Sequence, residues 1–141
     1  VSVSRRIFMG DAGSMLLGLI IAWALIKFSQ GDNRQFNPVT ALWLFAVPVI
    51  EITASIVRRL TSGKSPFKPD LFHSHHLLMR MGFNEKSTLL IMIGFSFFMA
   101  IIGVIGEAFE ISEWVMFIGF ISIFVFHISC GRYLYYKYHS K

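Results

Sequence analysis

The chain has 141 residues, of which 55% are hydrophobic, 16% are aromatic and only 15% are charged. Soluble domains usually carry about 25% charged residues, so this composition excludes a globular surface that faces water throughout. The formal net charge of +5 could point to nucleic acid, but the cations flank apolar blocks and form no stripe interleaved with aromatic residues. The composition therefore indicates an integral membrane protein, and no nucleic-acid partner is expected.

Four apolar blocks have nearly the length of a bilayer crossing: residues 12–28, 39–57, 88–106 and 114–130. Their 17 to 19 residues cover about 26–28 Å as helix, close to the roughly 30 Å hydrocarbon core of a bilayer. Helix is expected because it satisfies every backbone hydrogen bond within the segment. The predicted fold is an all-α integral membrane protein with four transmembrane helices and a long loop, residues 58–87, that contains a short helix.

Lysine and arginine are unevenly distributed between the ends of these spans. Eleven lie in the N-terminal segment, the 58–87 loop and the C-terminal tail, whereas Lys27 and Arg34 flank the 29–38 loop. The remaining connection, residues 107–113, contains three glutamates and no cation. Because cytoplasmic segments are enriched in lysine and arginine, both termini and the 58–87 loop are predicted to be cytoplasmic.

The first candidate functional stretch is FMGDAGS, residues 8–14, at the predicted cytoplasmic start of the first span. Asp11 could be the N-cap of the helix and accept a hydrogen bond from the amide of Ser14. It could also hold Mg²⁺ against a diphosphate, because Gly10 and Gly13 would let a bulky ligand approach the backbone closely. The two interpretations are compatible.

The second candidate lies in the 58–87 loop, where His73, His75 and His76 occupy three of four positions. A capping pattern predicts a short helix over residues 71–81, with Gly82 just after its end. On this helix His73 and His76 share a face, and His75 is expected to point elsewhere.

Three interpretations of the histidine cluster remain open: a solvated loop, a zinc site, and imidazoles that hydrogen-bond phosphate oxygens at the membrane surface. Zinc is disfavoured because no cysteine or fourth acidic ligand lies at matching spacing. Phosphate binding is favoured. Arg80, four residues after His76 on the same predicted helix, is the best cationic candidate for such a site.

The third candidate is Glu51, an acid inside the second predicted span. An intramembrane acid is costly and is by default a functional-site hypothesis. Glu51 could equally reach the cytoplasmic surface, or pair with Arg58 or with a cation on another helix. His127 and Cys130, both within the fourth span, are interpreted as structural residues.

Residues 8–14 and the SPFKPDLFHSHH stretch, residues 65–76, together resemble the polyprenyl-phosphate N-acetylhexosamine-1-phosphate transferases. The resemblance covers essentially the whole chain. The SPFKPD sequence favours the N-acetylglucosaminyl branch over the muramoyl-pentapeptide and teichoic-acid branches.

The resemblance implies transfer of N-acetylglucosamine 1-phosphate from UDP-GlcNAc to undecaprenyl phosphate with release of UMP. This would be the first membrane step in the synthesis of O-antigen, common antigen or another cell-envelope polysaccharide. It implies a multi-pass protein of the bacterial inner membrane whose active site is cytoplasmic, with a second copy of the chain as a further expected partner in a homodimer.

By the same resemblance, Asp11 corresponds to the ligand of Mg²⁺, or alternatively Mn²⁺, and His73, His75 and His76 to an HxHH motif at the substrate phosphates. Glu51 falls where relatives often carry an acid. Ser74 stands where the family commonly has isoleucine, and this change is expected to be minor because the intervening side chain is not a ligand.

Members of the family also carry a paired-aspartate motif and an Asn/Asp-rich motif before the FMGD stretch, and neither occurs in this sequence. The chain is therefore expected to be the C-terminal part of a larger polytopic bundle, completed by N-terminal spans or by a complementary chain. It is expected to be inactive alone, and release of UMP by the purified 141-residue chain would contradict this. The alternative is a membrane subunit or pseudoenzyme without activity.

Overall fold

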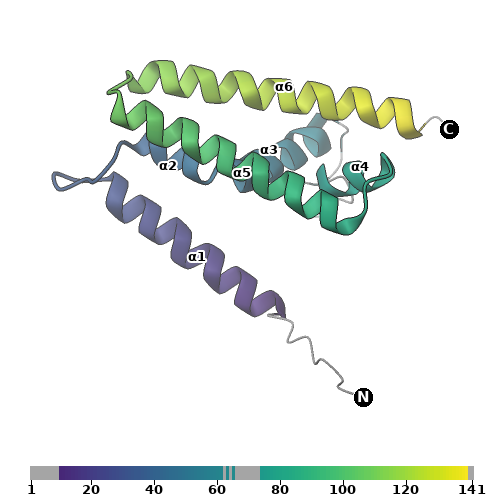
Figure 1. The fold of residues 1–141 in the computed structure, drawn as a ribbon, viewed down its shortest axis with the longest axis horizontal. Helices are drawn as coiled ribbons and strands as arrows, with labels where there is room; N and C mark the ends of the chain where they lie inside the picture. The colour runs from purple at the N-terminus through teal and green to yellow at the C-terminus, as the bar shows by residue number, and fades with distance from the viewer. Residues whose placement is uncertain (1–9, 62, 64, 66–73, 140–141) are drawn as a thin grey trace.

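The computed structural model describes residues 10–61, 63, 65 and 74–139, with only the backbone at residues 10, 11 and 135–139. Every regular element in this part of the chain is helical (Figure 1). The helices are α1 (Gly10–Ser29), α2 (Pro38–Leu44), α3 (Ala46–Thr61), α4 (Ser74–Arg80), α5 (Glu85–Ala108) and α6 (Glu113–His139). The all-α prediction is confirmed.

The chain crosses the length of the molecule repeatedly, so its connections collect at two ends. The α1–α2 loop and the α5–α6 turn lie at one end in Figure 1, whereas α4, the start of α5 and the end of α6 lie at the other. The structure therefore groups α4 with the C-terminal end of α6, as the distribution of cations predicted.

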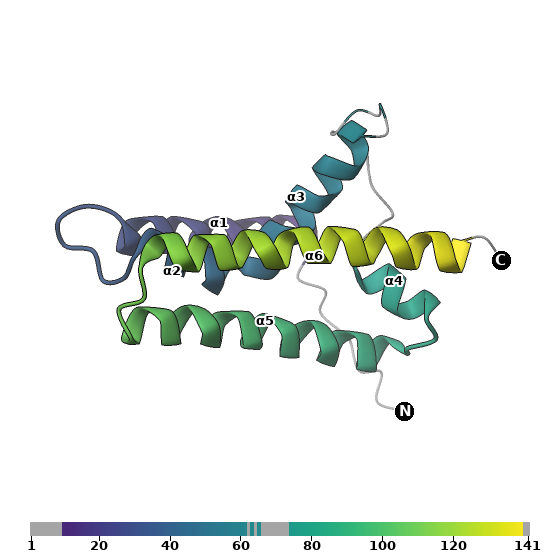
Figure 2. The ribbon, with the colours of Figure 1, turned by 90° about the horizontal axis from the view of Figure 1, so that it is seen from above.

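Three helices are long and apolar enough to cross a membrane, over Ala12–Ser29, Glu85–Ala108 and Glu113–Leu134. The fourth candidate is the pair of α2 and α3, which passes the same test only jointly and is bent by 83°. In Figure 2, α3 leaves the bundle at a steep angle to the long helices. The prediction of one unbroken helix over residues 39–57 is therefore wrong.

The bend follows from Pro48. In a continuous helix, proline would leave the carbonyl of Leu44 without its donor, and the ring would clash with that carbonyl. The break at Phe45 instead places Pro48 in the first turn of α3, where backbone N–H groups need no helical partner. Phe45 completes both helices, since its amide donates to Ala41 O at 3.2 Å and its carbonyl accepts from Val49 N at 3.3 Å.

The small core is centred on Trp43 of α2, which is only 3% exposed. Its ring meets Phe120 of α6 edge-on at a centroid distance of 5.7 Å, and its indole N–H donates to Met116 O at 3.2 Å. On the opposite side it contacts Gly103 of α5, where a Cβ atom would lie 2.6 Å from the Cβ of Trp43. The absence of a side chain at Gly103 therefore lets α2 approach α5 closely.

The carboxylate of Glu107, near the end of α5, anchors the start of α2. It accepts hydrogen bonds from the backbone amide of Asn37 at 3.0 Å, from the Asn37 side chain at 3.2 Å and from the hydroxyl of Thr40. Helix N-termini leave amides unpaired and favour negative charge. Glu107 therefore caps α2 from another helix and ties the two helices together at this end.

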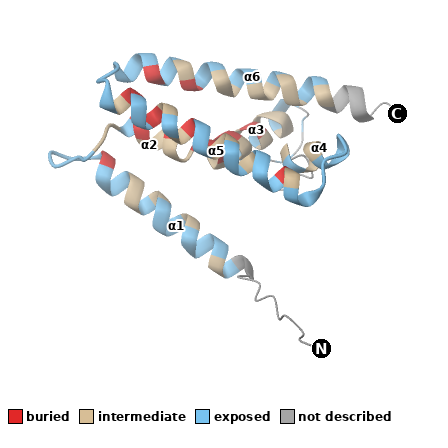
Figure 3. Ribbon diagram, in the orientation of Figure 1, coloured by how far each residue is buried: buried red, intermediate tan, exposed pale blue. Residues whose placement is uncertain are grey.

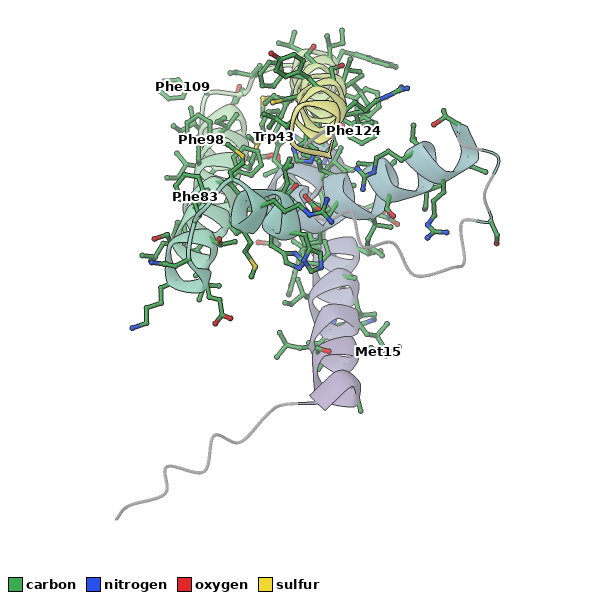
Figure 4. All side chains as sticks on the ribbon, turned by 90° about the vertical axis from the view of Figure 1, so that its right-hand side faces the viewer. Met15, Trp43, Phe83, Phe98, Phe109 and Phe124 are labelled. Atoms are coloured by element: carbon green, nitrogen blue, oxygen red, sulfur yellow. The ribbon has the colours of Figure 1, made fainter. Side chains whose placement is uncertain are left out.

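Many residues of the long helices are exposed (Figure 3), and large hydrophobic side chains are numerous among them. Helix α1 is the extreme case: it diverges from the other helices, and its Met15 is 74% exposed and far from Trp43 in Figure 4. A helix that is apolar on all sides requires lipid or other helices around it. This surface fits the expected membrane environment.

Candidate active site

The predicted metal ligand, Asp11, lies in the first turn of α1, next to Gly10. Its side chain, like the whole of His73, lies outside the described residues. Figures 1 and 4 show the start of α1 standing apart from α4, because α1 diverges from the bundle. The assignments of Asp11 to the metal and of the histidines to the substrate phosphates therefore stay predictions.

The histidine-bearing segment forms α4, a helix of seven residues. The expected helix over residues 71–81 is confirmed from Ser74 onwards, and residues 71–73 are not described. The helix ends as predicted at Gly82, whose φ of +97° is left-handed and favours glycine. The amides of Gly82 and Phe83 donate to the carbonyls of Met79 at 3.1 Å and Leu78 at 3.2 Å, which is a Schellman motif.

Two of the three histidines lie close together on α4. The rings of His75 and His76 have centroids 4.1 Å apart and planes inclined by 39°. The expectation that His75 points elsewhere is therefore wrong, because two adjacent imidazoles can turn toward each other in the first turn of a short helix. Arg80 lies in the last turn and is exposed, one turn beyond His76.

Glu51 of α3 meets Ser74 of α4 and His127 of α6. The carboxylate accepts from the backbone amide of Ser74 at 3.2 Å and from its hydroxyl, and His127 Nε2 lies 3.5 Å from the nearer oxygen. The Glu51 and His127 side chains are 15% and 24% exposed. The Ser74 hydroxyl contacts both partners, and its oxygen lies 3.3 Å from His127 Nε2. Sequence reasoning assigned no such contact to Ser74, and whether the change from isoleucine is minor for function stays a prediction.

Sequence reasoning did not find the pairing of His127 with Glu51. The available signal was weak: two ionisable residues in separate predicted spans, Glu51 about two turns and His127 about one turn from the same predicted membrane face. Intramembrane ionisable residues usually pair with one another. The partner itself depends on which helices are neighbours, and the bend at Phe45 decides that.

These three residues lie on the wall of a cavity of about 290 Å³ between α3, α4, α5 and α6. Most of the lining is apolar, and Leu77, Leu78 and Met81 supply the α4 side. Arg58 of α3, two turns after Glu51, lines the same cavity. We refer to this space as the α3–α6 cavity.

A divalent metal needs several oxygen or nitrogen ligands within reach. Within the described residues, no group of three His, Cys, Asp or Glu side chains could hold one. Asp11 and His73 lie outside that search because their side chains are not described. The predicted metal site is therefore untested by the described residues.

The fold and the site together define a helical integral membrane protein that carries a histidine-bearing helix at one end of its bundle. The chain is 49% identical over 119 residues, or 84% of its length, to the undecaprenyl-phosphate alpha-N-acetylglucosaminyl 1-phosphate transferase of Pasteurella multocida. It is 45% identical over 87% of its length to the enzyme of that name from Haemophilus influenzae, and 44% over 89% to that from Yersinia pestis.

The chain belongs to the family of these transferases and matches their C-terminal portion. It spans about a third of the length of these relatives, with 33% of the Pasteurella protein and 35% of the Haemophilus protein covered. No family model matches the chain. No solved structure matches it either.

Proposed function

We propose that this chain forms part of a membrane transferase that moves N-acetylglucosamine 1-phosphate from UDP-GlcNAc to undecaprenyl phosphate and releases UMP. The observation that carries the proposal is the identity of 44–49% to three transferases over 84–89% of the chain. The reaction would begin the assembly of a cell-envelope polysaccharide at the bacterial inner membrane.

The reaction brings together two anionic phosphates, so the protein has to neutralise charge and align the reacting groups. Helix α4 offers the matching groups. His75 and His76 would donate hydrogen bonds to phosphate oxygens, and Arg80 would supply a fixed positive charge one turn away. The neighbouring His73 would extend this set.

Mg²⁺ or Mn²⁺ would be held by the Asp11 carboxylate together with water and phosphate oxygens, since Mg²⁺ usually binds through one or two carboxylates and substrate phosphates. When bound, the ion would neutralise charge on the diphosphate. Gly10 and Gly13 on either side would let the diphosphate approach the backbone of α1.

The cation distribution favours an orientation with α4 and both termini in the cytoplasm, where a nucleotide sugar is available. The relatives are about three times as long as the matched segment. We propose that helices equivalent to their remaining two thirds pack against α1, whose apolar surface has few partners among the described residues. A homodimer is a further arrangement that the exposed apolar surface allows.

The test uses a chimeric transferase, in which this chain replaces the matching C-terminal part of the Pasteurella relative. We expect Mg²⁺-dependent release of UMP from UDP-GlcNAc and transfer of the sugar to undecaprenyl phosphate. Replacement of Asp11 by Asn should lower kcat by about 100-fold or more, the scale of losing one group that stabilises charge in the transition state.

The matched control is Asp32→Asn, the same chemical change in the exposed loop after α1, at the opposite end of the molecule. Its kcat should stay within about twofold of the parent, as for surface substitutions away from a site. An inactive parent chimera that folds and inserts into the membrane would refute the proposed function. An Asp11→Asn enzyme with full turnover would remove Asp11 from the metal site.

A further inference from the structure

The cluster of Glu51, Ser74 and His127 joins three helices at a point where apolar packing alone would leave α4 loosely defined. Helix α4 has seven residues, too few to be stable by itself. The half-buried Leu77 and Leu78 of α4 line the α3–α6 cavity, together with Met81 just after the helix. Hydrophobic contact is not directional, so these side chains hold α4 against the bundle but do not determine its exact rotation.

Directional contacts are made at the first residue of the helix. The amide of Ser74 is one of the N–H groups that a helix N-terminus leaves without a partner, and it donates to Glu51 Oε2 at 3.2 Å. The hydroxyl of Ser74 donates to the other oxygen, Oε1. The two bonds hold one residue at two atoms, and this determines both its position and its orientation.

His127 of α6 approaches the same carboxylate. Its Nε2 atom lies 3.5 Å from Glu51 Oε1 and 3.3 Å from Ser74 Oγ. Because the Ser74 hydroxyl donates to Glu51, Nε2 takes the donor role in this cluster. Both oxygens of a mostly buried carboxylate therefore have partners, which burial of a charged group requires.

The geometry excludes a nucleophile–base relay. In such a relay the histidine contacts the hydroxyl through one ring nitrogen and the carboxylate through the other. Here the hydroxyl and the carboxylate both approach Nε2. The arrangement is therefore that of a clamp and not of a serine–histidine–carboxylate relay.

We propose that Glu51 and His127 are positioning residues for the phosphate-binding helix. Together with Ser74 they form a clamp, defined as these three residues, that fixes the start of α4 and so aligns the adjacent His75 and His76 with the substrate phosphates. The expected effect of the clamp on catalysis rests on the proposed function. The expected ordering of α4 by the clamp does not depend on which reaction the protein catalyses.

The first test measures the order of α4 without substrate, in the complete 141-residue chain in lipid nanodiscs. Nitroxide labels are placed at two exposed positions, Met79 of α4 and Tyr133 of α6, after the native Cys130 has been replaced by Ser. The parent should give one narrow distance distribution. Both Glu51→Gln and Ser74→Ala should broaden it, whereas Ser74→Thr, which keeps the amide and the hydroxyl, should leave it narrow.

The second test measures kinetics in the chimeric transferase. Glu51→Gln, Ser74→Ala and His127→Phe should each lower kcat by about 10- to 100-fold, the range for groups that orient a functional residue. KM for UDP-GlcNAc should change less than about threefold, because the phosphate-binding groups are all still present. Ser74→Thr should restore most of kcat. The matched control is Ser122→Ala, which removes a hydroxyl bonded only within α6, to Ile118 O at 2.8 Å.

The outcomes separate the two proposals. Unchanged distance distributions in both Glu51→Gln and Ser74→Ala would overturn the clamp, even if the chimera is active. Broadened distributions with unchanged kcat would overturn the positioning role. An inactive parent chimera would count against the proposed function, and the distance measurement would still decide whether the clamp orders α4.

Discussion

The replacement of Gly103 by Ala tests whether close approach of α2 and α5 organises the bundle. A Cβ atom at this position would lie 2.6 Å from Trp43 Cβ, 3.5 Å from Trp43 Cγ and 3.6 Å from the carbonyl oxygen of Thr40. The first of these is the serious conflict. A Cβ atom is fixed to its backbone, so the contact can be relieved only if one helix moves.

Two effects of opposite sign set the magnitude. Alanine is favoured over glycine in a helix by about 1 kcal/mol, whereas overpacking of a well-packed site costs about 1–3 kcal/mol. Gly94→Ala isolates the first effect, because Gly94 is an exposed residue of the same helix with no atom within 4 Å of the added Cβ. The difference between the two variants therefore measures the conflict with Trp43.

The assay is thermal unfolding of the purified chain in detergent, followed by size-exclusion chromatography of the protein that remains folded. At about 4 °C per kcal/mol for a chain of this size, Gly103→Ala should unfold about 4–12 °C below Gly94→Ala. Gly106→Ala should fall between them, since its nearest neighbours are the Cε and Sδ atoms of the flexible Met116 side chain. Equal midpoints for Gly103→Ala and Gly94→Ala would refute the reasoning.

Three further changes test the turns and ends of the helices. Glu107→Ala should lower the free energy of unfolding by about 1–3 kcal/mol, because the amide of Asn37 loses its acceptor. Glu113→Ala, which removes an exposed ion pair and an acid in the first turn of α6, should cost less than about 1 kcal/mol. Pro48→Ala should reduce the 83° bend between α2 and α3, measured by nitroxide distances across the bend, and an unchanged distance would assign the bend to packing alone. Gly82→Ala should cost about 1–2 kcal/mol because of its left-handed backbone, and a midpoint equal to that of the parent would argue against the Schellman end of α4.

The positions of the long helices were predictable from the sequence, because a bilayer requires long apolar segments with internally paired backbones. The residues that end the helices could also be predicted, because their conformational preferences are properties of single residues. Gly82 ends α4 as expected, and its positive φ is a property of glycine itself. The family also followed from two short stretches, residues 8–14 and 65–76, which the match to the transferases supports.

The histidine cluster shows where local reasoning stopped. The sequence predicted that His73 and His76 would share a face, which follows from helical spacing. It did not predict that the tilted rings of His75 and His76 would lie 4.1 Å apart, since this depends on side-chain rotation at the start of a short helix. Nor did it assign a role to Ser74, whose partners lie 23 and 53 residues away in sequence.

The sequence by itself determined that this protein spans a membrane, where its long helices lie, which ends they share and to which family it belongs, since hydropathy, charge and motif are properties of consecutive residues. The tertiary structure decided that the second span is divided near Pro48, that Trp43 packs closely against Gly103, and that Glu51 contacts Ser74 and His127. The contacts of Trp43 and of Glu51 depend on the distance and angle between separate helices. In an apolar solvent, polar side chains such as Glu51 and His127 have few alternatives to one another, so the packing of the helices determines which pairs form.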